Sequence, residues 1–272
     1  MPDGGVARTA CGASAAPRKE LLVSVSTLLF LGLAALGASV MDTIAGGGGL
    51  ITLPALLAAG LPPLSALATN KGQSVWGSTT ALARFSRTDL LDRKRAPWAF
   101  PCGFFGSLAG VLLLRSVPSD VLQPLVLGLL LGAAFMVLAV RPRPRGVERQ
   151  RGLRWTLIVA GAIGMYDGFF GPGTGTLLIL ADVLFWRHPY DRASANAKVV
   201  NCASNWGALM VFACAGDVQW RVALVMAAGQ VAGGIVGTHL VVRRGQRLVR
   251  AAAVVISLAL AARVAWQLAM RP

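Results

Sequence analysis

The stretch GASVMDTIAGGGGLITLPALLAAGLPPLSALATNKGQSVWGS (residues 37–78) is the most informative part of this chain, because a second stretch repeats its pattern. The second stretch is GAIGMYDGFFGPGTGTLLILADVLFWRHPYDRASANAKVVNCASN (residues 161–205). In each, an aspartate stands four residues before a glycine cluster. A short apolar segment, a proline-containing turn and a segment with a lysine then follow. The same order of features in both stretches indicates an internal repeat.

The spacing within the two stretches strengthens this interpretation. Lys71 follows Asp42 at almost the same spacing at which Lys198 follows Asp167, and the small difference fits a two-residue insertion near His188. Offsets of three and seven residues put side chains on one face of a helix. The small polar residues at these offsets from the two lysines are Ser74, Ser78, Asn201 and Asn205.

The rest of the chain has the composition of a membrane protein. It is 55% hydrophobic and 14% charged, whereas soluble domains are about 25% charged. A helix that crosses a membrane needs about 20 mostly apolar residues. Uncharged runs of nearly that length or longer are 21–41, 96–114, 121–140, 199–216 and 222–242. We predict an all-α polytopic membrane protein with about eight to ten transmembrane segments.

Two further apolar segments, 50–61 and 174–186, are too short to cross a membrane comfortably. One interpretation is a short or tilted helix. The other is a broken helix whose freed backbone groups line an internal cavity, since unwound backbone cannot face lipid.

These segments divide the chain into four regions. We predict a disordered tail at 1–20, a first transmembrane repeat at 21–140, a basic cytoplasmic linker at 141–154 and a second repeat at 155–272. A signal peptide is an alternative for the N-terminal region, with Arg18 and Lys19 before an apolar run. The five segments of the first repeat are 21–45, 49–61, 64–84, 96–115 and 121–140. Those of the second repeat are 153–171, 174–186, 193–214, 221–242 and 248–270.

The net charge of +15, from 26 basic and 11 acidic residues, is concentrated in loops. A basic excess often indicates nucleic-acid binding, but here its distribution predicts membrane orientation. Equivalent loops of the two repeats differ in charge: where one is basic, its counterpart carries at most one basic residue. The basic loops hold Arg84, Arg87, Arg93, Lys94 and Arg95 in the first repeat, and Arg187, Arg192, Arg243, Arg244, Arg247 and Arg250 in the second.

Basic loops stay in the cytoplasm, so this exchange predicts that the two repeats are inverted. Five crossings in each repeat then place both termini outside and the linker inside. A rival topology makes the short segments re-entrant, which gives eight crossings with both termini inside. The total number of basic residues inside is about the same for both topologies, and the loop-by-loop exchange favours inversion.

The two lysines are the candidate binding residues for a substrate. A charge in mid-membrane is costly, so one interpretation is that Lys71 and Lys198 extend to the membrane surface. The other is that both face an internal cavity, where a charge and hydrogen-bond donors suit a small oxyanion. The polar residues predicted around them are Asn70, Ser74, Ser78, Asn196, Asn201 and Asn205.

The glycine clusters favour the second interpretation. Each opens a short helix, whose N-terminus offers free N–H groups and a positive dipole end. Broken helices of inverted-repeat transporters meet near the midplane and bind substrate there, whereas the alternative is tight packing of small residues. The glycines predicted to bind substrate are Gly46, Gly47, Gly48, Gly171 and Gly173.

Three roles are open for Asp42 and Asp167, which can neutralise the lysines, coordinate a coupling cation or carry a proton. Asp182 and His239 lack this matched pattern, and we interpret both as local residues.

The repeated motifs resemble the signature regions of the TauE/SafE family of membrane transporters. The resemblance runs from about 21 to 268. It implies a bacterial inner-membrane permease with two related halves that moves sulfite, organosulfonates or other small anions, mostly outward. Trp76 follows the first lysine and is expected to narrow the substrate range. The matching segments are TIAGGGGLITLPALLAAGLPP (43–63), ATNKGQSVWGSTTALARF (68–85), YDGFFGPGTGTLLI (166–179) and RASANAKVVNCASN (192–205).

We therefore predict a secondary transporter for a small anion, embedded in a lipid bilayer and coupled to a proton or cation. No Walker A motif is present, so this chain is not expected to use ATP directly. A passive anion channel is the alternative. An intramembrane protease is disfavoured, because no Gly-x-Gly-Asp follows Tyr166-Asp167. With two His and two Glu, the sequence predicts no metal site, cofactor or nucleic-acid partner.

Overall fold

Nine helical elements and no strand make up the residues that this computed structural model describes, 24–139 and 151–269. The predicted tail at 1–20 and most of the predicted linker lie outside these residues. The helices are α1 (Val25–Ala45), α2 (Gly49–Ala58), α3 (Pro63–Phe85), α4 (Ala96–Arg115), α5 (Ser119–Ala139), α6 (Leu153–Phe169), α7 (Thr174–Phe185), α8 (Tyr190–Cys214) and α9 (Trp220–Ala269). The prediction of an all-α fold is confirmed.

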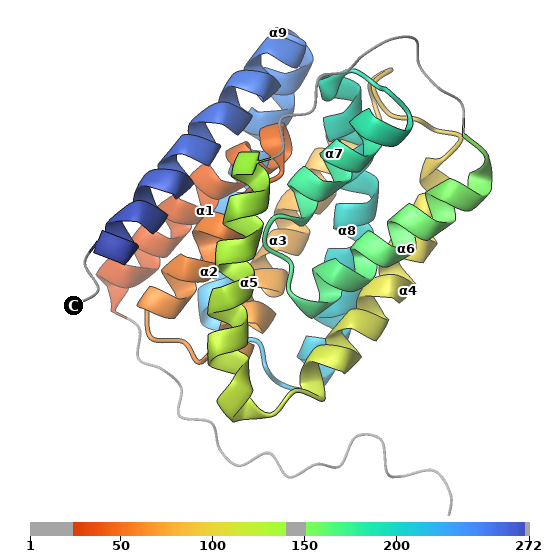
Figure 1. The fold of residues 1–272 in the computed structure, drawn as a ribbon. Coiled ribbons are helices and arrows are strands. Elements are labelled where there is room, and N and C mark those ends of the chain that lie inside the picture. The colour runs from red at the N-terminus through yellow and green to blue at the C-terminus, as the bar shows by residue number, and fades with distance from the viewer. Residues whose placement is uncertain (1–23, 140–150, 270–272) are drawn as a thin grey trace, which may run out of the picture.

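One difference from the predicted segments lies in α9, which joins the segments expected at 221–242 and 248–270. No proline interrupts the sequence between them, so helical hydrogen bonding can continue. A straight helix of 50 residues would be about 75 Å long. Figure 1 instead shows α9 turning at the top of the view, so that its dark-blue end runs back down.

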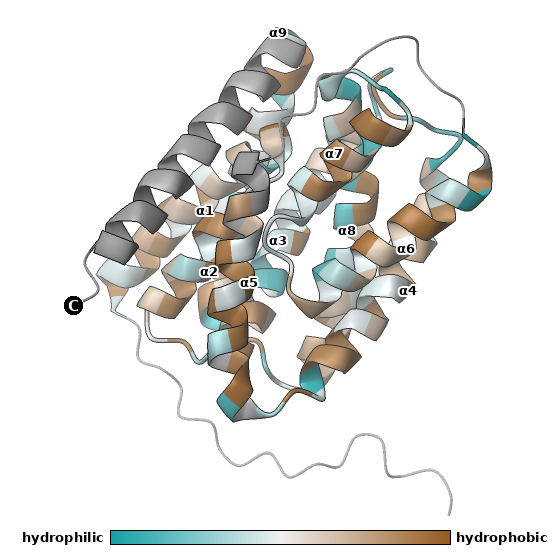
Figure 2. Cartoon of the chain, in the orientation of Figure 1, coloured by the Kyte–Doolittle hydropathy of each residue, from teal (hydrophilic) through white to brown (hydrophobic). Residues whose placement is uncertain are grey.

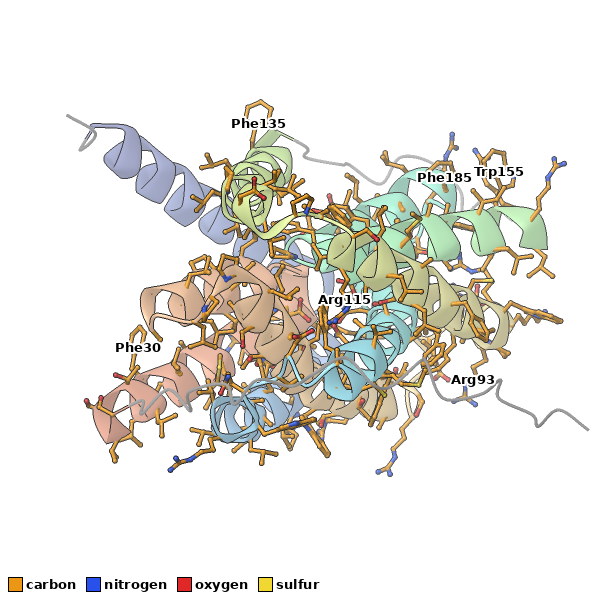
Figure 3. The ribbon with its side chains drawn as sticks, turned by 90° about the horizontal axis from the view of Figure 1, so that it is seen from below. Phe30, Arg93, Arg115, Phe135, Trp155 and Phe185 are labelled. Atoms are coloured by element: carbon orange, nitrogen blue, oxygen red, sulfur yellow. The ribbon has the colours of Figure 1, made fainter. Side chains whose placement is uncertain are left out.

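The outer surface of the helices is apolar, as a lipid environment requires. By length and composition, α1, α4 and the Trp220–Arg244 part of α9 can each cross a membrane. Phe30 of α1 and Phe135 of α5 point away from the protein in Figure 3 and are 61% and 71% exposed. Figure 2 shows hydrophobic residues along the helices and hydrophilic residues near several helix ends. These features confirm the prediction of a membrane protein.

The first helix of each half packs most extensively against the fourth helix of the other half. In this exchange α1 lies against α9, and α6 lies against α4. A Cβ on Gly106 would overlap the carbonyl oxygen of Gly161, and a Cβ on Gly233 would overlap that of Leu36. Gly106 and Gly233 are as far apart in the chain as the two motif lysines, and Leu36 and Gly161 are as far apart as the two motif aspartates. Matched positions therefore make the same close contact, in which small residues let the helix backbones approach.

A second reciprocal contact ties α3 and α8 to the loops before the fourth helices. Thr69 Oγ1 accepts the N–H of Gln219 at 3.0 Å, and Asn196 Oδ1 accepts the N–H of Asp92 at 2.8 Å. The two acceptors, and likewise the two donors, have the same separation in the chain as the two motif lysines. The repeat seen in the sequence therefore corresponds to matched contacts between the halves.

The ends of several helices can be located in Figure 1, and the inverted relation of the two halves stays a prediction. There, α1 begins and α9 ends at the lower left, whereas α5 ends and α6 begins in the upper part of the view. The basic α3–α4 loop and the turn of α9 lie at the upper end as well. The orientation of the repeats in a membrane stays a prediction.

Reporter fusions test this orientation. Alkaline phosphatase, which is active only outside the cytoplasm, is expected to be active at the C-terminus and inactive in the linker between α5 and α6, because basic loops stay inside. A fluorescent protein that folds only in the cytoplasm should give the opposite pattern, and a fusion in the α3–α4 loop should match the linker. A cytoplasmic C-terminus would instead support the eight-crossing topology.

Candidate functional site

A small cavity lies where the two halves meet, between the glycine clusters and helices α3 and α8. Its volume is about 20 Å³, which holds little more than one water molecule. The predicted residues that line it are Asp42, Gly46, Gly48, Asn70, Lys71, Ser74, Asp167, Gly171, Gly173, Asn201 and Asn205. The structure thus brings most of the predicted binding residues together.

Each motif lysine pairs with the aspartate of the opposite half. Lys71 Nζ lies 2.7 Å from Asp167 Oδ1 and donates to Asn205 Oδ1 at 3.3 Å. Lys198 Nζ donates to the Asp42 carboxylate and, at 2.8 Å, to the Asp42 carbonyl oxygen. The two lysines are 3% and 2% exposed. Both are therefore inside the protein rather than extended to its surface.

The two ion pairs are not equivalent. Ser204 Oγ donates to Asp167 Oδ2, and the Asp167 side chain is 2% exposed. The Asp42 side chain is 24% exposed, and its closest backbone donor is Gly48 N, 3.4 Å from Oδ1. Gly77 occupies the position that matches Ser204 when the two lysines are aligned, and it supplies no hydroxyl. Asp167 is thus held as a buried, hydrogen-bonded carboxylate, whereas Asp42 is more open.

The glycine clusters line one side of the cavity. Glycine is needed there because several of these residues have a positive φ angle and their backbone is closely packed. The φ angles of Gly46, Gly171 and Gly173 are +80°, +94° and +85°, a region that favours glycine. A Cβ on Gly46 would overlap the backbone of Gly175 in the other half. The alternative role of the glycines, tight packing, therefore operates beside the cavity and is compatible with it.

Two short helices open at the cavity through their amino ends. Gly48 is the N-cap of α2 and Gly173 is the N-cap of α7, and neither N-cap has a side chain to satisfy the first N–H groups. A Cβ on Gly171 would lie 3.0 Å from Lys71 Nζ. The positive ends of two helix dipoles therefore lie close to the buried cations.

Several predicted residues lie outside this cavity. Gly47, Ser78 and Lys198 are adjacent to it: Lys198 stands behind Asp42, and Ser78 Oγ accepts from Asn205 Nδ2 at 3.2 Å. Trp76 is 43% exposed and does not line the cavity, so the expected narrowing by its ring does not occur in this structure.

Asn196 is separated from the cavity altogether, which corrects its grouping with the other asparagines. Its Nδ2 donates to Asp182 Oδ2 at 3.1 Å. A helix turns 100° per residue, so Asn196 lies about 140° around α8 from Asn201 and faces another part of the protein.

The structure adds three lining residues that the sequence patterns did not single out, Gly49, Gly175 and Gln230. Gln230 comes from α9 and is 5% exposed. In the sequence, Gln230 is a single amide in an otherwise apolar segment, which could have indicated a polar role. That segment lies outside both motifs, so the motifs do not point to it. Asn201 Oδ1, in the same cavity, is buried without a hydrogen-bond partner among the described residues.

Asp182, interpreted from sequence as local, belongs to an ion cluster between the halves. Arg95 contacts Asp182 Oδ1 at 2.8 Å and Asp92 Oδ2 at 2.7 Å, and its guanidinium lies 4.4 Å from the Trp186 ring centroid. His188 Nδ1 is 2.7 Å from Asp182 Oδ2. Burial raises the pKa of Asp92, but the hydrogen bonds and charge of Arg95 outweigh it and hold the pKa below its ordinary value.

Comparison with known proteins identifies relatives over most of the chain. A family model described as sulfite exporter TauE/SafE matches residues 31–264. The probable membrane transporter protein YfcA of Escherichia coli (strain K12) is 39% identical over 250 residues, covering 89% of this chain and 92% of that protein. A Sinorhizobium protein, probable membrane transporter protein ORF9, is 39% identical over 241 residues, covering 87% and 92%. A probable membrane transporter protein of Haemophilus influenzae is 36% identical over 232 residues, covering 84% and 91%. No solved structure matches the chain.

Proposed function

The chain belongs to the sulfite exporter TauE/SafE family, and from this membership we propose that it is a secondary transporter that moves a small anion across the bacterial inner membrane. The resemblance of its motifs to this family is confirmed, and the names of its relatives indicate a membrane transporter rather than an enzyme. The observation that carries the proposal is the reciprocal pairing of each buried lysine with the aspartate of the other half.

The binding chemistry of the cavity suits an oxyanion such as sulfite or a small organosulfonate. Lys71 and the amino ends of α2 and α7 offer positive charge, and Asn70, Ser74, Asn201 and Asn205 offer hydrogen bonds. Charge-assisted hydrogen bonds to such oxygens are stronger than neutral ones. Lys198 can join them once it is released from Asp42.

The charges of the two ion pairs cancel, and this constrains the mechanism. With two lysines and two aspartates, the cavity has no net charge to attract an anion. A proton on one aspartate would free its lysine and leave one net positive charge. We therefore propose that a singly charged anion and a proton are moved together, with no net charge transferred.

Asp42 is the better carrier of that proton. It is more exposed than Asp167 and lacks the hydroxyl that Ser204 gives Asp167. The charged groups around it are Lys198 of α8, together with Lys71 and Asp167 across the cavity, whereas α2, α7 and α9 contribute uncharged lining residues. In this scheme Asp167 stays paired with Lys71 and holds it in place.

The cavity of the described conformation is small for a substrate. A cavity of about 20 Å³ is smaller than a four-atom oxyanion needs. Binding therefore requires α2 or α7 to move, and Gly46 and Gly171 lie at the chain turns before these helices. Movement of one half against the other around a fixed site is the usual mechanism of inverted-repeat transporters.

Flux into liposomes tests the proposal. Purified protein is expected to accumulate one of sulfite, thiosulfate, sulfate, sulfoacetate or acetate against its gradient when a pH gradient is imposed. For one proton per anion, a difference of one pH unit drives accumulation of about tenfold, since 1.4 kcal/mol is a factor of ten. Lys94→Ala, in an exposed basic loop, serves as the matched control and should behave as wild type. Flux that only dissipates gradients would indicate a channel, and no flux of any anion would contradict the proposal.

A further inference from the structure

A second and larger cavity lies at the ends of α4, α6, α7 and α8, beside Arg95. Its volume is about 50 Å³, enough for several waters or a small solute. Thr156 Oγ1 and Trp186 Nε1 belong to residues that line it, and within the described chain neither atom has a hydrogen-bond partner. Both residues are at least nine-tenths buried. Buried polar groups are normally satisfied, so these two atoms indicate that the cavity accommodates a polar guest.

On α6 and α7 this cavity and the central one follow each other along one face. On α8 only Ala197 shares the face of Asn201, and the other lining residues, Asn196, Val199 and Val200, lie further around the helix. Residues that line the two cavities are spaced by three, four or seven positions, which are the spacings of one helical face. Named with the residue of the second cavity first, the pairs are Ala160 and Asp167 on α6, Leu178 and Gly175 on α7, and Ala197 and Asn201 on α8. On α7 and α8 the step is about one turn, or 5 Å. The buried side chain of Leu178 stands at that step.

The matched positions of the other half carry different residues. Thr156, Ala181 and Ala99 of the second cavity correspond to larger apolar residues, which fill the equivalent space. In the same order these are Leu31, Leu56 and Met226, all fully buried in one hydrophobic cluster. Likewise Arg95 and Asp182 correspond to Val222 and Leu57. The opening therefore results from smaller and more polar residues at particular positions of an otherwise matched fold.

We infer that this second cavity is a vestibule through which the anion reaches the central site from the end of the protein that carries the basic loops. The inference rests on the proposed function. Trp186 Nε1–H and the Thr156 hydroxyl donate to the oxygens of the anion, whose methylene groups, where present, contact the alanine and valine walls. Arg95 faces two carboxylates, Asp92 and Asp182, so its charge is taken up within the cluster. An anion in the vestibule is then held by the neutral donors alone and can pass on, as a site of passage requires. At the opposite end, Leu31, Leu56 and Met226 close the equivalent path.

Thiol labelling tests access to the vestibule without requiring transport. Ala181→Cys and, as its matched control, Leu56→Cys are placed in a background whose native cysteines are replaced by serine or alanine. In purified protein, a small charged methanethiosulfonate should react at position 181 about ten times faster or more than at position 56, because thiol reactivity follows access. Equal rates at the two positions would overturn the inference. The native cysteines to be replaced are Cys11, Cys102, Cys202 and Cys214.

Filling the vestibule tests its part in transport. Thr156→Leu and Ala181→Leu copy the residues of the closed half and should each lower anion flux about tenfold or more, since gating at a constriction depends on its open volume. Their Tm should stay level or rise, because a cavity is filled. Wild-type flux in both filled variants would show a mere packing gap and overturn the vestibule alone. Absence of flux in the wild type itself would instead overturn the proposed function.

Discussion

Lys71→Ala and Lys198→Ala should each reduce anion flux to the level of empty liposomes, the largest effect expected of any substitution in the chain. Lys71→Ala removes a cation from the cavity and leaves Asp167 buried and unpaired, and Lys198→Ala removes the cation beside the cavity and leaves the more exposed Asp42 unpaired. Breaking a buried ion pair in this way costs about 3–5 kcal/mol of stability. Proteoliposome flux and the Tm of purified protein should therefore both fall, so a single substitution does not separate binding from folding.

A charge-neutral double variant makes that separation. Lys71→Met with Asp167→Asn removes both charges of the buried pair, and such replacements are often neutral or stabilising. We expect it to recover the Tm lost in Lys71→Ala but to remain without flux, because the cation itself binds the anion. Lys71→Arg is the complementary variant, since it retains the charge but alters the geometry. Normal flux in the neutral double variant would show that Lys71 has only a structural role.

The extent of the helices followed from the sequence because hydrophobic length and glycine or proline punctuation are local signals. The N-cap at Gly173 lies where the second glycine cluster predicts it, and α3 starts at Pro63, one residue before the predicted segment. The join within α9 did not follow, because a basic stretch without proline is compatible with either a loop or a continuous helix. The pairing of Lys71 with Asp167 depends on how the halves meet, which no local pattern encodes.

The second cavity was beyond prediction for a related reason. Thr156 and Ala181 are ordinary residues in a membrane helix, and their meaning emerges only beside the larger Leu31 and Leu56 at matched positions. Asp182 shows the same limit: without a counterpart in the first half it was interpreted as a local residue, whereas Arg95 lies 87 positions earlier in the chain. Differences between repeats become informative once the matched contacts have fixed which residues correspond.

Those differences suggest that the two chemically similar ion pairs have different roles. The Lys71–Asp167 pair is more buried and carries an additional hydroxyl, so it is suited to holding charge in a fixed place. The Lys198–Asp42 pair is more open on its carboxylate side, so it is suited to exchanging a proton. Two identical ion pairs would have the same proton affinity, so neither aspartate would be protonated before the other.

Asp42→Asn should abolish proton-driven accumulation of the anion while retaining downhill flux. The amide does not take up a proton as a carboxylate does, and it leaves Lys198 free to bind an anion without a proton being loaded first. Under a difference of one pH unit, the expected accumulation of about tenfold should therefore fall to none. Flux should also become electrogenic and nearly independent of pH, because one negative charge crosses without its proton. The measurements are isotope accumulation under a pH gradient and the response of flux to a potassium diffusion potential.

Asp167→Asn is the matched control, because it removes the equivalent carboxylate from the other half. Here the amide leaves Lys71 charged in a buried site whose hydroxyl partner, Ser204, cannot replace the lost charge. We expect lower Tm and lower flux, with proton coupling preserved in the flux that remains. The two variants together identify the proton carrier. If Asp167→Asn uncouples transport and Asp42→Asn does not, the proton is carried by Asp167, and the greater exposure of Asp42 does not identify the carrier. If both remain coupled, the proton travels with the substrate rather than on either aspartate.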